Sequence, residues 1–219
     1  RSGNINLTGN ANNNSIPINL TDGVIAATGG NVTLTGDEIQ LSGKTQGNGT
    51  GTITLQPQTQ GKAITIGGAN QVGFLNLDQA ELDTLNGFSQ MVIRGADGTG
   101  AIKIDPAGVT FNFPVTMQAT TIEVDGNITG VNNASITFKA PTTKLNANIV
   151  TNEQNITFDQ QVFLGTDSNV TLNAGTDRGN INFRGTVDGD GNLVLTTGIG
   201  VINLSGPMGG NVPLRSLRI

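Results

Sequence analysis

The stretch Gly30-Asn31-Val32-Thr33-Leu34-Thr35-Gly36 sets a pattern that returns along the whole chain. Its two large apolar residues alternate with threonines, which is the period-2 pattern of a β-strand with one buried face. The glycines at its ends and the asparagine favour turns, so the strand is expected to be short. Similar phrases begin at Gly3, Asn155, Asn169 and Gly179. The sequence therefore predicts a fold of many short, similar strands.

The spacing of equivalent residues indicates how these strands are arranged. Residues of the same type or character recur 20 or 21 positions apart, as in Thr33 and Thr54, Phe138 and Phe158, Phe163 and Phe183, and Phe183 and Leu204. A turn of a parallel β-helix holds about 20 to 25 residues, so residues one turn apart stack about 4.8 Å from each other. A β-sandwich is the alternative, but its core usually contains Trp or Tyr. Because the chain has neither residue, we predict an all-β fold, a parallel β-helix (solenoid).

Composition limits both the class of protein and its chemistry. Of the 219 residues, 35% are hydrophobic, which is enough for a folded core. The absence of Cys excludes disulfides and thiol chemistry. The net charge is -5 and the few cations are scattered, so no nucleic-acid binding is expected. No apolar run approaches the length of about 18 residues that a membrane-spanning helix needs, so no membrane span is expected.

Residues 77–86 break the strand pattern. Asp78 is a suitable N-cap, and Glu81 three residues later completes a capping box. Leu82 would face the core, and Gly87 would end the helix. We therefore predict a short α-helix that lies against the flank of the solenoid or covers one apolar end, where a strand edge would otherwise be open.

The length fits a single β-helix domain over residues 1–219. A boundary at Phe113-Pro114 would instead divide the chain into two repeat modules, 1–113 and 114–219. The sequence begins at Arg1 without a Met or a signal peptide, so we expect it to be a fragment of a larger protein.

Two longer stretches have a more specific pattern than the strand phrases. The first runs from Thr54-Leu55-Gln56-Pro57 through Leu77-Asp78-Gln79-Ala80-Glu81-Leu82 to Arg94-Gly95-Ala96-Asp97-Gly98-Thr99-Gly100. The second joins several strand phrases within residues 180–219. Both resemble repeat modules of the filamentous-haemagglutinin-like large exoproteins, the β-strand-repeat surface adhesins of Gram-negative bacteria and cyanobacteria.

The resemblance implies a right-handed β-helix that is secreted or displayed on the bacterial cell surface, where it serves adhesion or acts as a spacer. It implies no catalytic residues and no enzyme. The expected partners are the surface of a host or neighbouring cell, the extracellular matrix, and neighbouring repeats of the parent exoprotein. The secretion domain of the family is not matched, so the resemblance leaves the secretion route open.

One loop has the spacing of a weak calcium site. Asp188, Asp190 and Asn192 place oxygen-bearing side chains at alternate positions, and Ca²⁺ prefers several converging carboxylate and carbonyl oxygens. However, Leu193 stands where an EF-hand loop requires Gly, and Asp-Gly and Gly-Asn are strong turn formers. We favour a turn, and we expect no other metal and no cofactor.

Carboxylates are the main candidates for catalysis, because the chain lacks His, Cys and Tyr. Asp97 with Asp105, or Glu123 with Asp125, could supply the pair that glycoside hydrolysis needs. The alternative function is therefore a carbohydrate-binding or carbohydrate-active β-helix that uses surface carboxylates. A concave groove lined by several carboxylates would favour it. The absence of Trp and Tyr platforms counts against it.

Three further patterns have simpler interpretations. Asn-x-Ser/Thr sequons exceed chance about twofold, but the repeat phrase itself contains Asn-x-Thr. The segment 94–97 resembles an integrin-binding tripeptide with one residue inserted, so we expect a glycine turn with a local Arg and Asp pair. Thr-x-Thr pairs suggest an ice-binding surface, in which a flat ladder of threonines orders water, but the pairs do not recur coil after coil. The ten sequons start at Asn6, Asn13, Asn19, Asn31, Asn48, Asn127, Asn133, Asn155, Asn169 and Asn203.

Overall fold

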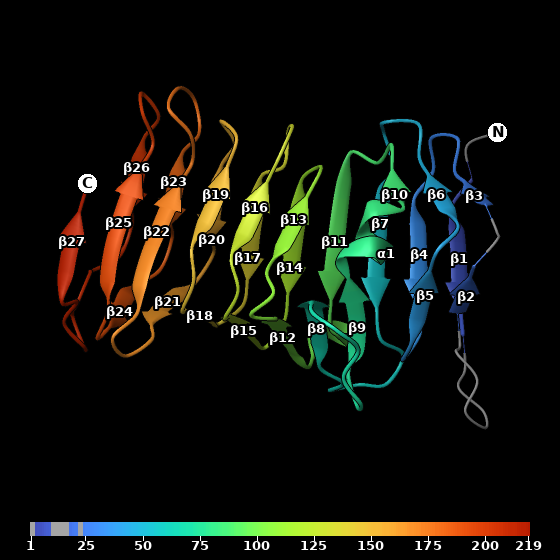
Figure 1. Ribbon diagram of the computed structural model, residues 1–219, viewed down its shortest axis with the longest axis horizontal. Coiled ribbons are helices and arrows are strands. Elements are labelled where there is room, and N and C mark those ends of the chain that lie inside the picture. Colours follow the sequence, from blue (N-terminus) through green and yellow to red (C-terminus); the bar gives the residue numbers. More distant parts are fainter. Residues whose placement is uncertain (1–2, 10–17, 22–23) are drawn as a thin grey trace.

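The computed structural model describes residues 3–9, 18–21 and 24–219, which form a parallel β-solenoid of about nine turns. We call each turn a rung. The rungs follow one another along the long axis of the molecule, with the N-terminus at one end and the C-terminus at the other (Figure 1). This confirms the fold class predicted from the spacing of the strand phrases.

The strands form three faces, and every strand pairing is parallel. The first face is one sheet of nine strands: β1 (Ile5–Thr8), β4 (Val32–Thr35), β7 (Thr52–Gln56), β11 (Gln90–Arg94), β14 (Val115–Gln118), β17 (Ile136–Lys139), β20 (Ile156–Phe158), β23 (Ile181–Phe183) and β26 (Ile202–Leu204). The second face has a pair, β2 (Ile18–Leu20) and β5 (Ile39–Leu41), followed by a sheet of seven: β9 (Leu75–Asp78), β8 (Ile64–Gly67), β12 (Ala101–Ile104), β15 (Thr121–Val124), β18 (Thr142–Leu145), β21 (Gln161–Leu164) and β24 (Val187–Gly189). The third face has three strands, β3 (Val24–Ala26), β6 (Lys44–Gln46) and β10 (Leu85–Asn86), followed by six: β13 (Val109–Phe111), β16 (Ile128–Gly130), β19 (Ile149–Thr151), β22 (Asn169–Asn173), β25 (Asn192–Thr196) and β27 (Ser216–Arg218).

Three of the four predicted stacking pairs are confirmed by the register. Thr33 pairs with Thr54, Phe138 with Phe158, and Phe183 with Leu204. The fourth pair, Phe163 and Phe183, is wrong. Phe163 lies on the second face, where it pairs with Lys144 and Asp188. Phe183 instead pairs with Phe158, 25 residues earlier, because that rung has longer turns.

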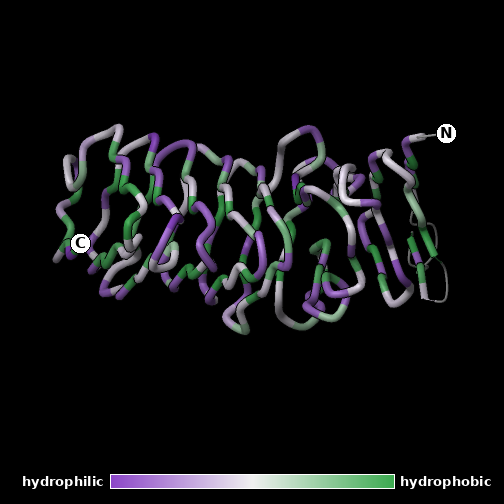
Figure 2. Tube along the Cα trace, turned by 90° about the horizontal axis from the view of Figure 1, so that it is seen from above, coloured by the Kyte–Doolittle hydropathy of each residue, from purple (hydrophilic) through white to green (hydrophobic). Residues whose placement is uncertain are grey.

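The core is a continuous column of apolar side chains inside the rungs. Phe138, Phe158 and Phe183 stack face to face, with ring centroids 4.8 and 5.1 Å apart. Apolar and polar residues alternate along most strands, so the coloured trace changes repeatedly between hydrophobic and hydrophilic (Figure 2). This alternation directs Ile, Leu, Val and Phe inward and Thr and Asn outward.

The Gly-Asn part of the repeat phrase joins successive rungs. The Oδ1 of Asn155 accepts a hydrogen bond from the backbone N–H of Asn180 at 3.0 Å, and the Oδ1 of Asn180 accepts one from Val201 at 2.7 Å. Glycine allows the backbones to approach closely, because a Cβ on Gly51 would lie 2.0 Å from the carbonyl oxygen of Gly30. The phrase therefore recurs for a structural reason.

The predicted helix is present but shorter than expected. Helix α1 spans Gln79–Asp83, and Asp78 and Glu81 form the predicted capping box. It lies on the flank of the solenoid rather than over an end (Figure 1), and it contacts β5, β9, β10 and β13. A second helical segment, the 3₁₀ turn η1, spans Ala96–Gly98. None of the helices in the described part of the chain is long and apolar enough to cross a membrane.

The rung that contains α1 is irregular. Ile53 of β7 pairs with Met91 of β11, 38 residues later. The rung is this long because the chain after β8 returns toward the N-terminal end and forms β9 beside β8, parallel to it, before the helix begins. As a result the second and third faces are both interrupted at this rung, whereas the nine-stranded first face continues. The first face also continues past this position, because β14, which begins at Val115, pairs with β11 on one side and β17 on the other. The division into modules 1–113 and 114–219 stays a prediction.

Candidate functional site

The interruption of the second face creates a groove. Strands β5 and β9 are neighbours there but are not joined by a ladder of backbone hydrogen bonds. Two cavities of about 390 and 310 Å³ open beside them, and Glu38, Asn70 and Asn76 line both. We call the two cavities together the junction groove.

Helix α1 forms one wall of this groove, and its side chains hydrogen-bond to backbone groups at the strand edges that the interruption leaves open. The carboxylate of Glu81 accepts hydrogen bonds from the backbone N–H of Leu41 at 3.2 Å and of Asp78 at 3.0 Å. The side-chain amide of Gln79 accepts from the backbone N–H of Thr110 at 2.7 Å and donates to its carbonyl at 3.0 Å. The helix thus satisfies the edge of β5 on the second face through Glu81 and the edge of β13 on the third face through Gln79.

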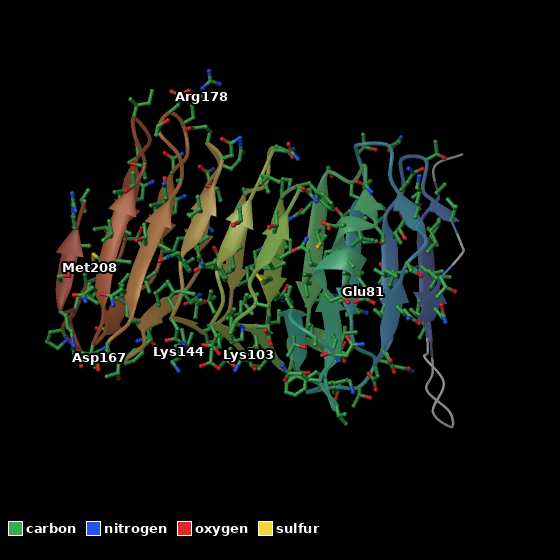
Figure 3. The ribbon with its side chains drawn as sticks, viewed as in Figure 1. Glu81, Lys103, Lys144, Asp167, Arg178 and Met208 are labelled. Carbon is green, nitrogen blue, oxygen red and sulfur yellow. The ribbon has the colours of Figure 1, made fainter. Side chains whose placement is uncertain are left out.

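Glu81 lies in the N-terminal half of the rod (Figure 3), and the residue is only 9% exposed. Burial raises the pKa of Glu81 to about 7, helped by the negative charges of Asp78 and Glu38, although the hydrogen bonds from Asp78 and Leu41 oppose the shift. A carboxyl group with this pKa can be protonated or ionised near neutral pH.

The opposite wall is held by a network of short hydrogen bonds. Asn76 accepts from the hydroxyl of Thr65 at 2.6 Å and from the backbone N–H of Gln71 at 2.8 Å, which fixes the loop before β9. Asp37 accepts from the backbone N–H and the hydroxyl of Thr59. Burial would raise the pKa of Asp37, but the hydrogen bonds from Thr59 and the charge of Lys62 lower it below its usual value.

The groups that the groove offers to solvent are mainly polar, with the fully exposed Val72 and one aromatic ring beside them. Glu38, Gln40 and Asn70 are exposed, and the half-buried Phe74 lines the larger cavity. Carboxylates and amides that converge beside an aromatic ring can hydrogen-bond a polyhydroxylated ligand and stack against it.

The sequence predicted part of this site. The capping box marks Glu81 as a helix residue, but its contact with Leu41 joins positions 40 residues apart. That contact exists only because β9 doubles back. No local pattern in the sequence indicates that β9 returns to this side of β8, so the sequence does not predict the groove.

The calcium candidates are engaged by different protein groups. Asp188 is 1% exposed and accepts from the backbone N–H of Asn211 at 2.9 Å, a bond that holds its pKa below the usual range. Asp190 binds the guanidinium of Arg215, with contacts of 2.6 and 3.0 Å. Asn192 donates to Asn169 across the rungs at 2.8 Å. Within the described residues, no three Asp or Glu side chains gather as a metal cluster, and calcium binding at this loop stays a prediction.

The carboxylates proposed for sugar chemistry are paired with other side chains. Glu123 binds Lys144 at 2.8 Å, and Asp125 binds Lys103 at 2.8 Å. The two lysines lie along the same edge of the molecule (Figure 3). Burial would raise the pKa of Asp125, but hydrogen bonds from Lys103 and Asn146 lower it. A carboxyl group held ionised in this way is a poor proton donor at neutral pH.

The second predicted pair, Asp97 and Asp105, also has separate partners. Asp97 accepts from the side-chain amide of Gln60 at 2.7 Å, and Asp105 accepts from the backbone N–H of Ala107 at 3.0 Å. The expected glycine turn at Arg94–Asp97 is present, with Asp97 in the left-handed region at φ 50°. The expected pair between Arg94 and Asp97 is not, because the Nε of Arg94 donates to Gln56 at 2.6 Å.

Several sequon asparagines have structural roles. The side chains of Asn31, Asn127 and Asn155 accept hydrogen bonds from the backbone of the next rung. Asn13 lies outside the described residues. Whether any sequon is glycosylated stays untested.

Of the threonine pairs Thr33 with Thr35, Thr52 with Thr54 and Thr120 with Thr121, one member of each of the first two recurs. Across the first face, register pairing aligns Thr33, Thr54, Thr116, Thr137 and Thr157 in a column that is interrupted by Val92. The adjacent column holds longer side chains, including Arg94 and Lys139. The surface is therefore not the flat double threonine array that the ice-binding interpretation requires.

Comparisons with family models, curated proteins and solved structures returned no match.

Proposed function

We propose that this β-solenoid is a non-enzymatic structural and adhesive segment of a large secreted or cell-surface bacterial protein. The observation that supports the proposal is the uninterrupted nine-stranded parallel sheet along the rod, reinforced by hydrogen bonds between the side chains of one rung and the backbone of the next. Such a rod holds its length without a cofactor. Its outer columns of Thr and Asn provide a hydrated contact surface.

Surface labelling tests the location. An antibody raised against the folded chain should label intact cells of the source organism, and protease treatment of intact cells should remove the label. Labelling only after the cells are lysed would contradict the proposal.

A binding assay tests the adhesive part of the proposal. Beads coated with the folded chain should be retained on host cells or on extracellular-matrix proteins, whereas beads coated with heat-unfolded chain should not. Equal retention of both kinds of beads would contradict a role for the folded surface.

A second candidate function, carbohydrate binding, is favoured by the junction groove. Its carboxylates, amides and aromatic ring are suited to a neutral or basic sugar. Calorimetric titration with a panel of oligosaccharides should detect binding that Glu38→Ala weakens. Asp159→Ala, which removes a carboxylate in a salt bridge outside the groove, is the matched control. Equal affinity in both variants would exclude the groove as the sugar site.

A further inference from the structure

The junction groove contains a slot between the edges of two strands. Its smaller cavity is lined by residues 38–42, which include all of β5, and by Asn76 and Asp78 of β9. Ile39 and Leu41 of β5 direct their side chains into the core and are only 2% exposed. The cavity therefore follows the backbone edge of β5. We call the space between β5 and β9 the strand slot.

The backbone groups of β5 alternate between β2 and the slot. The carbonyl of Glu38 accepts a hydrogen bond from β2 at 3.3 Å, and the amide of Ser42 donates one to β2 at 3.2 Å. In a parallel strand the N–H and C=O of one residue point to one side, and those of the next residue point to the other. The backbone groups of Ile39 and Leu41 therefore point into the slot, where no strand of the described chain pairs with β5.

The facing edge of β9 is open in the same way. The amide of Leu75 donates to the carbonyl of Ala63, on the β8 side, at 2.9 Å. The backbone groups of Asn76 and Asp78 therefore point away from β8 and into the slot. Among the described strands, β9 pairs only with β8. The slot thus lies between two unpaired strand edges inside the rod, and β2 covers β5 from the other side.

Glu81 shows which groups the slot accepts. One oxygen of its carboxylate accepts from the amide of Leu41 on β5, and the other accepts from the amide of Asp78 on β9. A neighbouring strand would place a carbonyl oxygen at each of these amides. Glu81 therefore fills one carbonyl position on each edge, beside α1. The N–H and C=O of Ile39, further along the slot, are left for a ligand.

The walls of the groove favour a positively charged ligand. Among the described lining residues, the carboxyl groups of Asp37, Glu38, Asp78 and Glu81 outnumber one cation, Lys62. Charge complementarity therefore favours basic side chains on the partner. An extended peptide directs alternate side chains to opposite faces. One row would lie beside the exposed Glu38 and should be basic, and the other would face the core and should be small and apolar.

We propose that the strand slot binds an extended peptide of another protein, which adds to the edge of β5 as a strand and carries basic side chains on its outer face. The peptide backbone pairs with the free groups of Ile39 and Leu41, and a basic side chain lies beside Glu38. This inference goes beyond the proposed function, because the slot offers the same groups wherever the protein is located.

Calorimetric titration with synthetic peptides tests the chemistry of the ligand. A short peptide of alternating lysine and valine should bind the folded chain. A copy with N-methylated backbone amides keeps every side chain but cannot pair as a strand, so it should bind at least about tenfold more weakly. A copy with glutamate in place of lysine should not bind. Equal affinity of the first two peptides, or binding of oligosaccharides but not of the lysine–valine peptide, would overturn the proposal.

Charge reversal tests the position of the site. Glu38→Lys should weaken binding of the lysine–valine peptide by about tenfold or more. Asp177→Lys is the matched control and should bind as the wild type does, because it alters an exposed carboxylate beside Arg178, far from Glu81 (Figure 3). Circular dichroism of both variants checks that they fold. An equal loss of affinity in both would mean that the peptide responds to the net charge of the chain, and would overturn the slot as the site.

Hydrogen exchange of the wild type identifies the edge that pairs. The amide of Ile39 faces the slot, so it should exchange rapidly in the free chain and more slowly when the peptide is bound. The amide of Gln40 faces β2 and should be protected in both states. Protection of Ile39 before peptide is added would show that another segment fills the slot, and unchanged exchange on binding would show that the peptide lies elsewhere. Either result would overturn the proposal.

Discussion

At the scale of single residues, stacking in register decides how much each side chain contributes to stability. Phe158 lies between Phe138 and Phe183, and it has no exposed surface. Phe163 is the same residue type on a neighbouring strand, but it faces outward and is half-buried. The two phenylalanines therefore allow a matched comparison.

Phe158→Ala should lower the free energy of unfolding by about 3–5 kcal/mol, because it removes a buried ring and leaves a cavity between two others. Phe163→Ala should cost about 1 kcal/mol or less, since its ring keeps contact with solvent. Chemical denaturation of both variants measures the difference. Similar costs would mean that stacking inside the rungs is not the main source of stability.

Glu81 gives the molecule a pH dependence that can be isolated. Its pKa is raised to about 7 in the folded chain, so folding favours the protonated form. The contribution of protonated Glu81 to the free energy of unfolding is fully present below the ordinary Glu pKa, and it is lost as the pH rises through about 7. The chain has no His. The other shifted carboxylates, such as Asp37 and Asp188, have lowered pKa values, so they change the stability only at acidic pH.

Between pH 5 and 8 the wild type should lose about 1–2 kcal/mol of stability, after allowance for solvent screening. Glu81→Gln should flatten this slope, whatever its effect on absolute stability. Glu123→Gln, which alters an exposed carboxylate, should keep it. Melting temperatures across this range are the measurement, and a flat wild-type profile would show that Glu81 is ionised throughout.

At the scale of elements, helix α1 substitutes for a missing strand. Its Gln79 side chain makes the two hydrogen bonds that a neighbouring backbone would make to Thr110 at the edge of β13. The side chain also contacts Asp83 at 2.9 Å, which aligns the amide. The element works through its side chains, since five residues are too few for a stable independent helix.

Gln79→Ala should lower stability by about 1–3 kcal/mol, because it leaves the backbone groups of Thr110 without partners in a partly buried place. Hydrogen exchange of the Thr110 amide should accelerate as well. Gln40→Ala, an exposed amide in the same groove, should change neither quantity. An unchanged Thr110 exchange rate in Gln79→Ala would mean that water replaces the amide at no cost.

The elements also show how far the sequence predicts the structure. A constant spacing of 20 or 21 identifies Phe138 above Phe158, because those rungs have turns of equal length. The same spacing is misleading for Phe163 and Phe183. The rung from Phe158 to Phe183 is 25 residues long, so residues 20 apart within it lie on different faces. The capping box predicts α1, but the doubling back of β9 depends on long-range packing. The groove that results therefore has no local pattern in the sequence.

At the scale of the whole molecule, a solenoid is nearly one-dimensional, because each rung contacts little beyond its two neighbours. The inner rungs are covered on both sides, whereas Leu7 and Ile202 of the first and last rungs stay partly exposed. Local opening should therefore start at the ends, where fewer contacts must be broken.

Hydrogen exchange tests this directly. The amides of β17 and β20 should be the most protected, and protection should fall toward β1 and β26. Phe158→Ala should lower protection mainly in β20 and its neighbours, and should leave β4 close to the wild type, because the lost contacts belong to adjacent rungs. An equal loss of protection in every strand would show instead that the rod unfolds in one cooperative step.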